Sequence, residues 1–252
     1  MNKIRVIARI DVKNEFAIKG IHLEGLRKVG NPNVMARKYY DGGIDEIVFM
    51  DAVAAYYDRN SLSDLIKEAC TDVFIPITVG GGIRSINDIS NALKSGADKV
   101  AINTKAVQEP DFIRQSSKVF GSQCIVASIE AKSINNGKWE VYIDNGREPT
   151  GIDVIEWAKH VEELGAGEIM LTSIDKEGTK KGFDIDLCQI VSSQVSIPII
   201  ASGGMGEAND AIKLVHHANI DAIAVASVLH YKTESIQNIK SSLEKNNIRV
   251  RI

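Results

Sequence analysis

The amino-acid sequence predicts an α/β protein, a (β/α)8 TIM barrel built from two similar half-barrels. Short apolar runs alternate with helical patterns along the whole chain, which is typical of parallel strands joined by helices. One phrase also recurs about half a chain later. The apolar run 75–79 breaks into three glycines at 80–82, and the run 197–202 ends in the same way at Gly203 and Gly204.

Other landmarks recur at nearly the same spacing, which distinguishes an internal repeat from a chance echo. The matching segments are 45–51 with 167–173, 96–104 with 219–227, and 10–13 with 129–132. The last pair places Asp11 and Glu130 at equivalent positions of the two halves. We therefore expect one domain, residues 1–252, with halves of approximately 1–120 and 121–252.

The first strand, 5–12, has a pattern with a period of two. Its even-numbered residues are apolar, and its odd-numbered residues include Arg5, Arg9 and Asp11. Because successive side chains of a strand point to opposite faces, the apolar set should pack against the outer helices and the charged set should point into the barrel. Charges inside a barrel are costly unless they are paired, so partners are expected from other strands.

The remaining elements follow in a regular order. Further strands are expected at 46–51, 75–79, 99–103, 124–131, 168–173, 197–202 and 222–226. Helices are expected at 34–41, 61–71, 85–95, 152–164, 186–193 and 207–217, with others opening near 109–110 and from 234. A loop should join the first strand to a helix start at 31–33. Asn-Gly pairs at 136–137 and 145–146 bracket a small hairpin, 138–143, above the barrel mouth.

Composition limits the classes of function. The chain has 252 residues, 44% of them hydrophobic, and a net charge of −3, which predicts no nucleic-acid footprint. Its three cysteines are scattered and its histidines show no ligand spacing, so we expect no metal and no cofactor. The first residues contain no apolar signal segment and no run approaches membrane-spanning length, so we expect a cytoplasmic protein that contacts no membrane.

The strand ends predict two phosphate sites, because active sites of such barrels lie at the carboxyl ends of the strands and glycines there expose backbone N–H groups. One site would combine Gly81, Gly82, Asn103 and Thr104, and the other Gly203, Gly204, Ala226 and Ser227. The ligand should then carry a phosphate at each end. Ser227 is equally suited to capping a helix.

At this point the sequence resembles a known family over essentially its whole length. The supporting segments are 11–13, 19–20, 45–51, 79–83, 96–104, 120–123, 165–175 and 197–204. Together and in order they are similar to the cyclase subunit of imidazole glycerol phosphate synthase. The resemblance implies that ammonia from a glutaminase subunit crosses the barrel. At the top it would attack a ribulosyl aminoimidazole carboxamide ribonucleotide that carries two phosphates.

The resemblance also assigns residues. It implies that Asp11 and Glu130 supply the general acid and base, and that Lys19 lies on a loop that covers the substrate. It adds Asp175, Glu177 and Gly178 to the substrate-binding residues. A ring of Arg5, Glu46, Lys99 and Glu168 would gate ammonia at the barrel bottom, where the glutaminase docks near Asp98. Without the resemblance, a structural salt-bridge plug would explain the ring equally well.

Three departures from the family pattern fall in the predicted site. Glu130 and Glu177 stand where the family has aspartate, and Arg9 replaces a small residue directly below Asp11. An arginine there could pair with Glu130, lower its pKa and remove it as an acid.

These departures keep alternatives open. A diverged copy of the cyclase could deliver ammonia to a partner enzyme that amidates a surface-polysaccharide sugar. A histidine-pathway isomerase on the related half-barrel scaffold would share the carboxylates and the phosphate sites but would not need the axial ring. A non-catalytic regulatory or scaffold protein would not need the two intact glycine sites.

Overall fold

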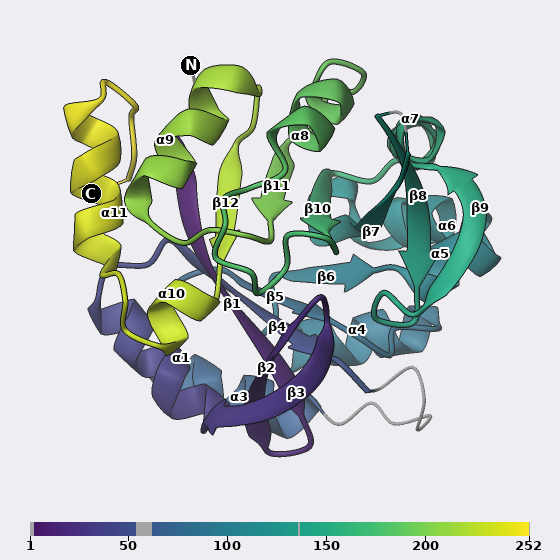
Figure 1. Ribbon diagram of the computed structural model, residues 1–252. Coiled ribbons are helices and arrows are strands. Elements are labelled where there is room, and N and C mark those ends of the chain that lie inside the picture. Colours follow the sequence, from purple (N-terminus) through teal and green to yellow (C-terminus); the bar gives the residue numbers. More distant parts are fainter. Residues whose placement is uncertain (1–2, 54–61, 136, 252) are drawn as a thin grey trace.

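The barrel is closed, as the sequence predicts (Figure 1). The computed structural model describes residues 3–53, 62–135 and 137–251. Around the barrel the parallel strands are β1 (Arg5–Lys13), β4 (Glu46–Asp51), β5 (Ile77–Gly80), β6 (Lys99–Ile102), β7 (Ile125–Asn135), β10 (Glu168–Ser173), β11 (Ile199–Ser202) and β12 (Ala222–Val225). Strand β12 pairs with β1 and closes the ring.

Helices connect the strands and cover the outside of the barrel (Figure 1). They are α1 (Pro32–Asp41), α3 (Leu62–Asp72), α4 (Ile86–Lys94), α5 (Thr104–Gln108), α6 (Asp111–Phe120), α7 (Val154–Glu163), α8 (Ile185–Ser192), α9 (Ala208–His217), α10 (Ser227–His230) and α11 (Ile236–Lys245). The short 3-10 turn Ser122–Cys124 precedes β7. The predicted start of one helix at Ser61 and the predicted turn residue Asn136 lie outside the described residues.

Several helix boundaries follow from local capping. Asn31 caps α1, because its side-chain oxygen accepts hydrogen bonds from the backbone N–H groups of Asn33 and Val34. This confirms the helix start predicted at 31–33. Where one helix was predicted near 109–110 the structure has two, α5 and α6, and the short helix α10 precedes α11.

The segment predicted as a loop after β1 is instead an antiparallel hairpin. It consists of β2 (Phe16–Ile21) and β3 (Glu24–Gly30), and β2 pairs with the upper end of β1. The two turn residues His22 and Leu23 adopt left-handed backbone conformations, which residues other than glycine rarely adopt. The sequence therefore carries no conventional turn signal there, and the loop prediction was wrong.

The second hairpin is larger than predicted. Strand β7 extends to Asn135 and pairs with β8 (Lys138–Ile143), which in turn pairs with β9 (Glu148–Asp153). Helix α7 consequently begins two residues later than expected, where Asp153 caps it. Trp139 is buried and its Nε1 donates to Asp184 Oδ2 at 3.2 Å, so β8 packs on the barrel rim.

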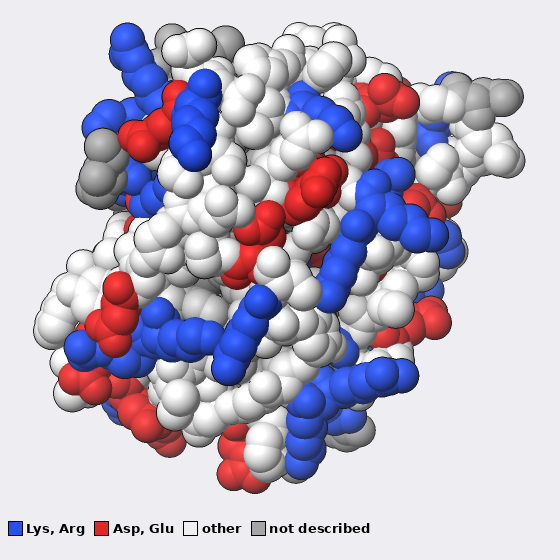
Figure 2. Space-filling model, turned by 60° about the vertical axis from the view of Figure 1, so that its left-hand side comes forward, with Lys and Arg blue, Asp and Glu red and all other residues white. Residues whose placement is uncertain are grey.

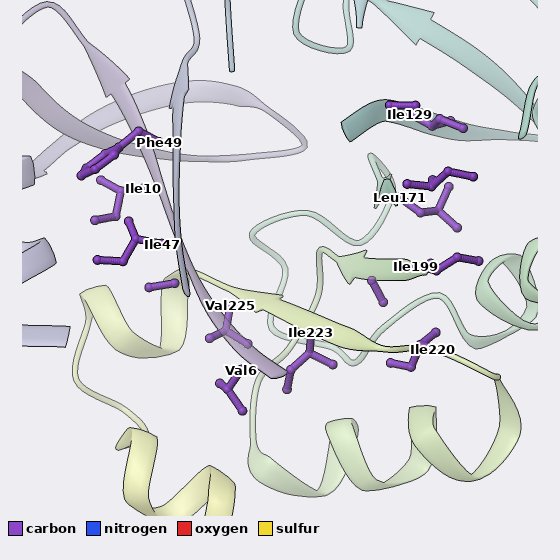
Figure 3. Close-up of a cluster of buried hydrophobic side chains, with 14 of the residues drawn as sticks. Val6, Ile10, Ile47, Phe49, Ile129, Leu171, Ile199, Ile220, Ile223 and Val225 are labelled. Atoms are coloured by element: carbon purple, nitrogen blue, oxygen red, sulfur yellow. The ribbon is translucent and has the colours of Figure 1, made fainter. Parts of the chain in front are cut away.

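The two faces of the strands have different roles. Outward-facing side chains such as Ile10, Ile47 and Phe49 form the core between barrel and helices (Figure 3). A separate apolar cluster that includes Ile7 and Met170 fills the barrel interior. This confirms the alternation predicted for the first strand.

The division into halves meeting near residue 120 stays a prediction. It is supported by Glu46 and Glu168, which begin β4 and β10 at equivalent places around the barrel.

We predict that Phe49→Ala lowers the free energy of unfolding by about 3–5 kcal/mol, because it empties a fully buried site in the outer core. Urea denaturation followed by circular dichroism measures the change. Phe74→Ala is the matched control, since Phe74 is 74% exposed and has an edge contact with Tyr40. Equal losses in the two variants would contradict the packing described here.

Candidate active site

Two buried carboxylates face each other across the barrel mouth. Asp11 comes from β1 and Glu130 from β7, and three strands separate β1 from β7 in either direction around the barrel. Asp11 is 6% exposed and Glu130 is 4% exposed. The structure thus places the two predicted catalytic residues on opposite strands of one water-poor site.

Asp11 is held between two cations. Its Oδ1 accepts a hydrogen bond from Arg9 Nε at 2.8 Å, and its Oδ2 lies 3.3 Å from Lys19 Nζ. Burial alone would raise the pKa of Asp11, but the charges of Arg9 and Lys19 outweigh burial and lower this pKa to about 2. Asp11 is therefore ionised at neutral pH.

Glu130 has a different environment. Burial raises the pKa of Glu130 to about 7, and the charge of Arg9 and the N–H of Gly146 oppose this only in part. The Gly146 N–H donates to Glu130 Oε2 at 2.8 Å. Near neutral pH, Glu130 can thus both hold and release a proton, which general acid–base catalysis requires. Paired carboxyl groups whose pKa values are pushed apart are typical of acid–base sites.

The expected ion pair between Arg9 and Glu130 is not formed, and the lowering of the Glu130 pKa by the charge of Arg9 is outweighed by burial. Arg9 forms its ion pair with Asp11 instead, and its Nη1 donates to Thr172 Oγ1 on β10 and to Ser202 Oγ on β11. These hydroxyl acceptors hold the guanidinium on one side of the barrel. Sequence reasoning could not foresee them, because Thr172 and Ser202 carry no charge that marks them as partners.

The β2–β3 hairpin closes over the site and buries Lys19. The ammonium group of Lys19 forms ion pairs with Asp11 and with Glu177. The backbone of the hairpin touches the segment after β10, because a Cβ on Gly178 would lie 2.2 Å from the Gly20 carbonyl oxygen. Gly178 therefore has to be glycine for the hairpin to lie this close.

The first predicted phosphate site forms one cavity. Gly81, Gly82, Asn103 and Thr104 line a space of about 280 Å³ that Glu130 also borders.

Sequence reasoning missed three other residues that line this cavity: Arg84, Lys105 and Asn145. Asn145 was taken only as a turn residue, although its Nδ2 is buried without a hydrogen-bond partner. Arg84 comes two residues after Gly82 and Lys105 directly follows Thr104, and this closeness to the predicted phosphate residues was the available signal for a basic phosphate contact.

The second predicted site is also assembled, in a nearly closed form. Residues lining it include Glu177, Gly178, Gly203, Gly204, Ala226 and Ser227. A Cβ on Gly204 would lie 2.1 Å from the Gly182 carbonyl oxygen, so only glycine fits there. Lys180 also lines this site and was not predicted.

Two predicted residues have other contacts. Ser227 is the first residue of α10, which has Ala226 at its N-cap position, so the capping role proposed for Ser227 was wrong. Asp175 Oδ2 accepts a hydrogen bond from the Ser133 N–H at 2.8 Å and so fixes the extension of β7. Asp175 is not among the residues that line the two glycine sites.

A ring of four charges lies at the amino-terminal end of the barrel. Arg5 pairs with both Glu46 and Glu168, with 2.8 Å between Arg5 Nη1 and Glu46 Oε1. Lys99 completes the ring, with its Nζ 2.8 Å from Glu168 Oε2 and 3.3 Å from Glu46 Oε2. Positive and negative groups thus alternate around the axis. Nearby, Asp98 accepts a hydrogen bond from the Ile77 N–H at 2.8 Å.

Other kinds of site receive no support from the described residues. Among them no group of three or more His, Cys, Asp or Glu side chains is arranged to hold a metal ion. No helix in this part of the chain is long and apolar enough to cross a membrane. Figure 2 shows acidic and basic side chains interspersed on the face that it displays.

A closed barrel with two opposed carboxylates and two glycine-lined sites at its mouth is typical of enzymes that act on phosphorylated metabolites. The model of the histidine biosynthesis protein family matches residues 5–235, and the chain belongs to this family. Two relatives are named imidazole glycerol phosphate synthase subunit HisF. The one from Legionella pneumophila is 60% identical over 207 residues, which cover 82% of this chain and 98% of the relative. The one from Bacillus cereus strain AH187 is 47% identical over 248 residues, 98% of each chain. The resemblance seen in the sequence is thereby confirmed.

The raised pKa of Glu130 predicts a pH-dependent stability. The folded state binds this proton more tightly than the unfolded state, so the stabilisation is complete below the ordinary value of 4.5 and is lost as pH rises through about 7. Glu130→Gln cannot ionise, so its stability relative to the native chain should rise by about 3 kcal/mol between about pH 4 and about pH 8. Urea denaturation at both pH values measures this difference.

The control for this prediction is Glu244→Gln, which alters an exposed side chain on α11. Its stability relative to the native chain should not depend on pH. A difference between Glu130→Gln and the native chain that stays constant with pH would show that Glu130 titrates as an ordinary glutamate.

Proposed function

We propose that the chain is the cyclase subunit of imidazole glycerol phosphate synthase. It uses ammonia to convert a ribulosyl aminoimidazole carboxamide ribonucleotide into imidazole glycerol phosphate and an aminoimidazole carboxamide ribonucleotide. The observation that carries this proposal is the pair of opposed carboxyl groups, Asp11 and Glu130, which have different charge states at neutral pH. The family membership and the names of the relatives agree with it.

Asp11 and Glu130 divide the proton transfers in this proposal. Ring closure and cleavage of a carbon–nitrogen bond require one group that accepts protons and another that donates them. The ionised Asp11 is the acceptor, and Glu130, with a pKa of about 7, is the donor. The glutamate is one methylene longer than the aspartate of the family pattern, and the Gly146 N–H fixes its end.

The two phosphate groups of the substrate would bind at the two glycine sites. One phosphate fits the cavity lined by Gly81, Gly82, Asn103 and Thr104, where Arg84 and Lys105 add positive charge. The other would bind at the site lined by Gly178, Gly203, Gly204, Ala226 and Ser227, beside Lys180. This site encloses only about 10 Å³, so it has to open to admit the phosphate. Lys19 would cover the bound substrate. Glu177 and Asp175 are proposed to support this second half of the site.

We further propose that ammonia reaches the mouth along the barrel axis. It would come from a glutaminase subunit that forms a heterodimer with this chain by docking at the amino-terminal face, with Asp98 near the contact. The ring of Arg5, Glu46, Lys99 and Glu168 lies at that end and would act as the gate. A cytoplasmic location follows from this proposed role.

The alternatives have weaker support. The relatives carry the name of a synthase subunit, and none of the comparisons indicates a sugar-amidating copy, an isomerase or a non-catalytic scaffold. The axial charge ring is also not needed by an isomerase.

The central experiment mixes the purified chain with an ammonium salt and the ribulosyl aminoimidazole carboxamide ribonucleotide and follows substrate loss by ultraviolet absorbance. We predict turnover that falls at least about a hundredfold in Glu130→Gln and in Asp11→Asn, because each variant removes one proton-transfer group. Glu244→Gln should retain native turnover. Tight binding of a bisphosphate analogue without any turnover by the native chain would instead favour an ammonia-delivering relative.

A second prediction concerns the ring. Replacing Lys99 by methionine removes one cation and should change the ratio of glutamine-driven to ammonium-driven turnover at least about fivefold in the complex with the glutaminase, because external ammonium bypasses the coupling between subunits. Both rates are measured on the same preparation. Lys94→Met, an exposed position on α4, is the control. An unchanged ratio in Lys99→Met would reduce the ring to a structural plug.

A further inference from the structure

Arg9 is an arginine held entirely inside the barrel. It is 2% exposed and belongs to the largest fully buried side chains of the protein. Its Nε donates to Asp11 Oδ1 at 2.8 Å, and its Nη1 donates to Thr172 Oγ1 at 3.0 Å and to Ser202 Oγ at 3.3 Å. The guanidinium group of Arg9 thus links strand β1 to strands β10 and β11 just below the barrel mouth.

This arrangement restricts both partners of the ion pair. A guanidinium is planar and its donors point in fixed directions, so three hydrogen bonds to three strands define its orientation. The Asp11 carboxylate is consequently held by Arg9 at one oxygen and approached by Lys19 at the other. A buried charge that lost such a partner would be strongly disfavoured.

The hydroxyl groups of Thr172 and Ser202, which anchor Arg9, favour its ion pair with Asp11 over one with Glu130. Glu130 stands on β7, across the barrel from β1, and is held by the Gly146 N–H. With its Nη1 engaged by Thr172 and Ser202, Arg9 remains on Asp11.

We infer that Arg9 is a positioning residue of the site: it keeps the Asp11 carboxylate ionised and fixed in direction, and its anchors on β10 and β11 leave Glu130 free to carry a proton. The inference rests on the proposed function and adds to it a residue that the family resemblance does not supply, since the family pattern has a small residue at this position. Arg9 acts through Asp11 and does not contact the substrate in this account.

The first test needs no substrate. Carbon-13 labelled aspartate carboxyl groups are titrated by NMR in the native chain and in Arg9→Met, and the Asp11 signal is assigned by its loss in Asp11→Asn. Methionine fills a similar volume without charge, so the titration midpoint of Asp11 should rise by about one pH unit or more. Arg37→Met is the control, because it removes an Arg–Asp pair on the exposed face of α1.

A second variant retains the charge and removes the anchors. Thr172→Val combined with Ser202→Ala should also raise the Asp11 midpoint. It should lower kcat of the ammonium-driven reaction about tenfold while KM for the ribonucleotide changes by less than about twofold, because the loss lies in the orientation of a catalytic group. This variant decides the question if Arg9→Met does not fold.

The possible results distinguish a failure of the Arg9 inference from a failure of the cyclase proposal. An Asp11 midpoint that is unchanged in Arg9→Met, or in the double variant, would overturn the role of Arg9. Absence of turnover in the native chain would count against the cyclase proposal and would leave the titration as a valid test of Arg9. Native kcat in the double variant of an active enzyme would likewise overturn the inference.

Discussion

The site depends on how charge is paired inside a closed barrel. Barrel closure brings side chains from opposite strands into an interior that excludes most water, where an ionised group is stable only with a partner. Arg9 and Lys19 give such partners to Asp11, whereas the Gly146 N–H donates a hydrogen bond to Glu130. The same burial therefore leaves one carboxyl group ionised and lets the other hold a proton at neutral pH.

The barrel interior is layered along its axis, and each layer has a separate task. The charge ring of Arg5, Glu46, Lys99 and Glu168 closes the amino-terminal end. An apolar cluster follows, and above it lie Arg9 and its hydroxyl partners, beneath the two carboxylates. Apolar packing in the middle separates the charges of the ring from those of the mouth.

Much of this architecture could be predicted from the sequence, because periodicity and internal repetition report directly on strands and on which face is buried. The barrel strands, the inward direction of Arg9 and Asp11, and the helix start at Asn31 followed from such local patterns. The two hairpins over the mouth were less accessible. The first turns through left-handed His22 and Leu23, and the second depends on pairing of β9, whose glycine and proline weaken any strand signal.

The sequence predicted which residues form the site better than it predicted which of them contact one another. Residues at strand ends converge whenever the barrel closes, so both glycine sites could be anticipated. The ion-pair and hydrogen-bond partners inside the mouth could not be anticipated, because they depend on distances between strands that are remote in sequence. Arg9 was assigned to Glu130 because charge alone suggested it, and the hydroxyls of Thr172 and Ser202 change that outcome. Asn145 was missed for a similar reason, because a turn signal concealed a side chain that lines a cavity.

The central claim is that burial, which the charge of Arg9 offsets only in part, raises the pKa of Glu130 to near neutrality. NMR titration of carbon-13 labelled glutamate carboxyl groups, with the Glu130 signal identified by its absence in Glu130→Gln, measures this directly. We predict a midpoint of about 7 for Glu130. A midpoint at or below the ordinary 4.5 would show that Glu130 is paired like Asp11, and the division of roles between the two carboxylates would then have to be abandoned.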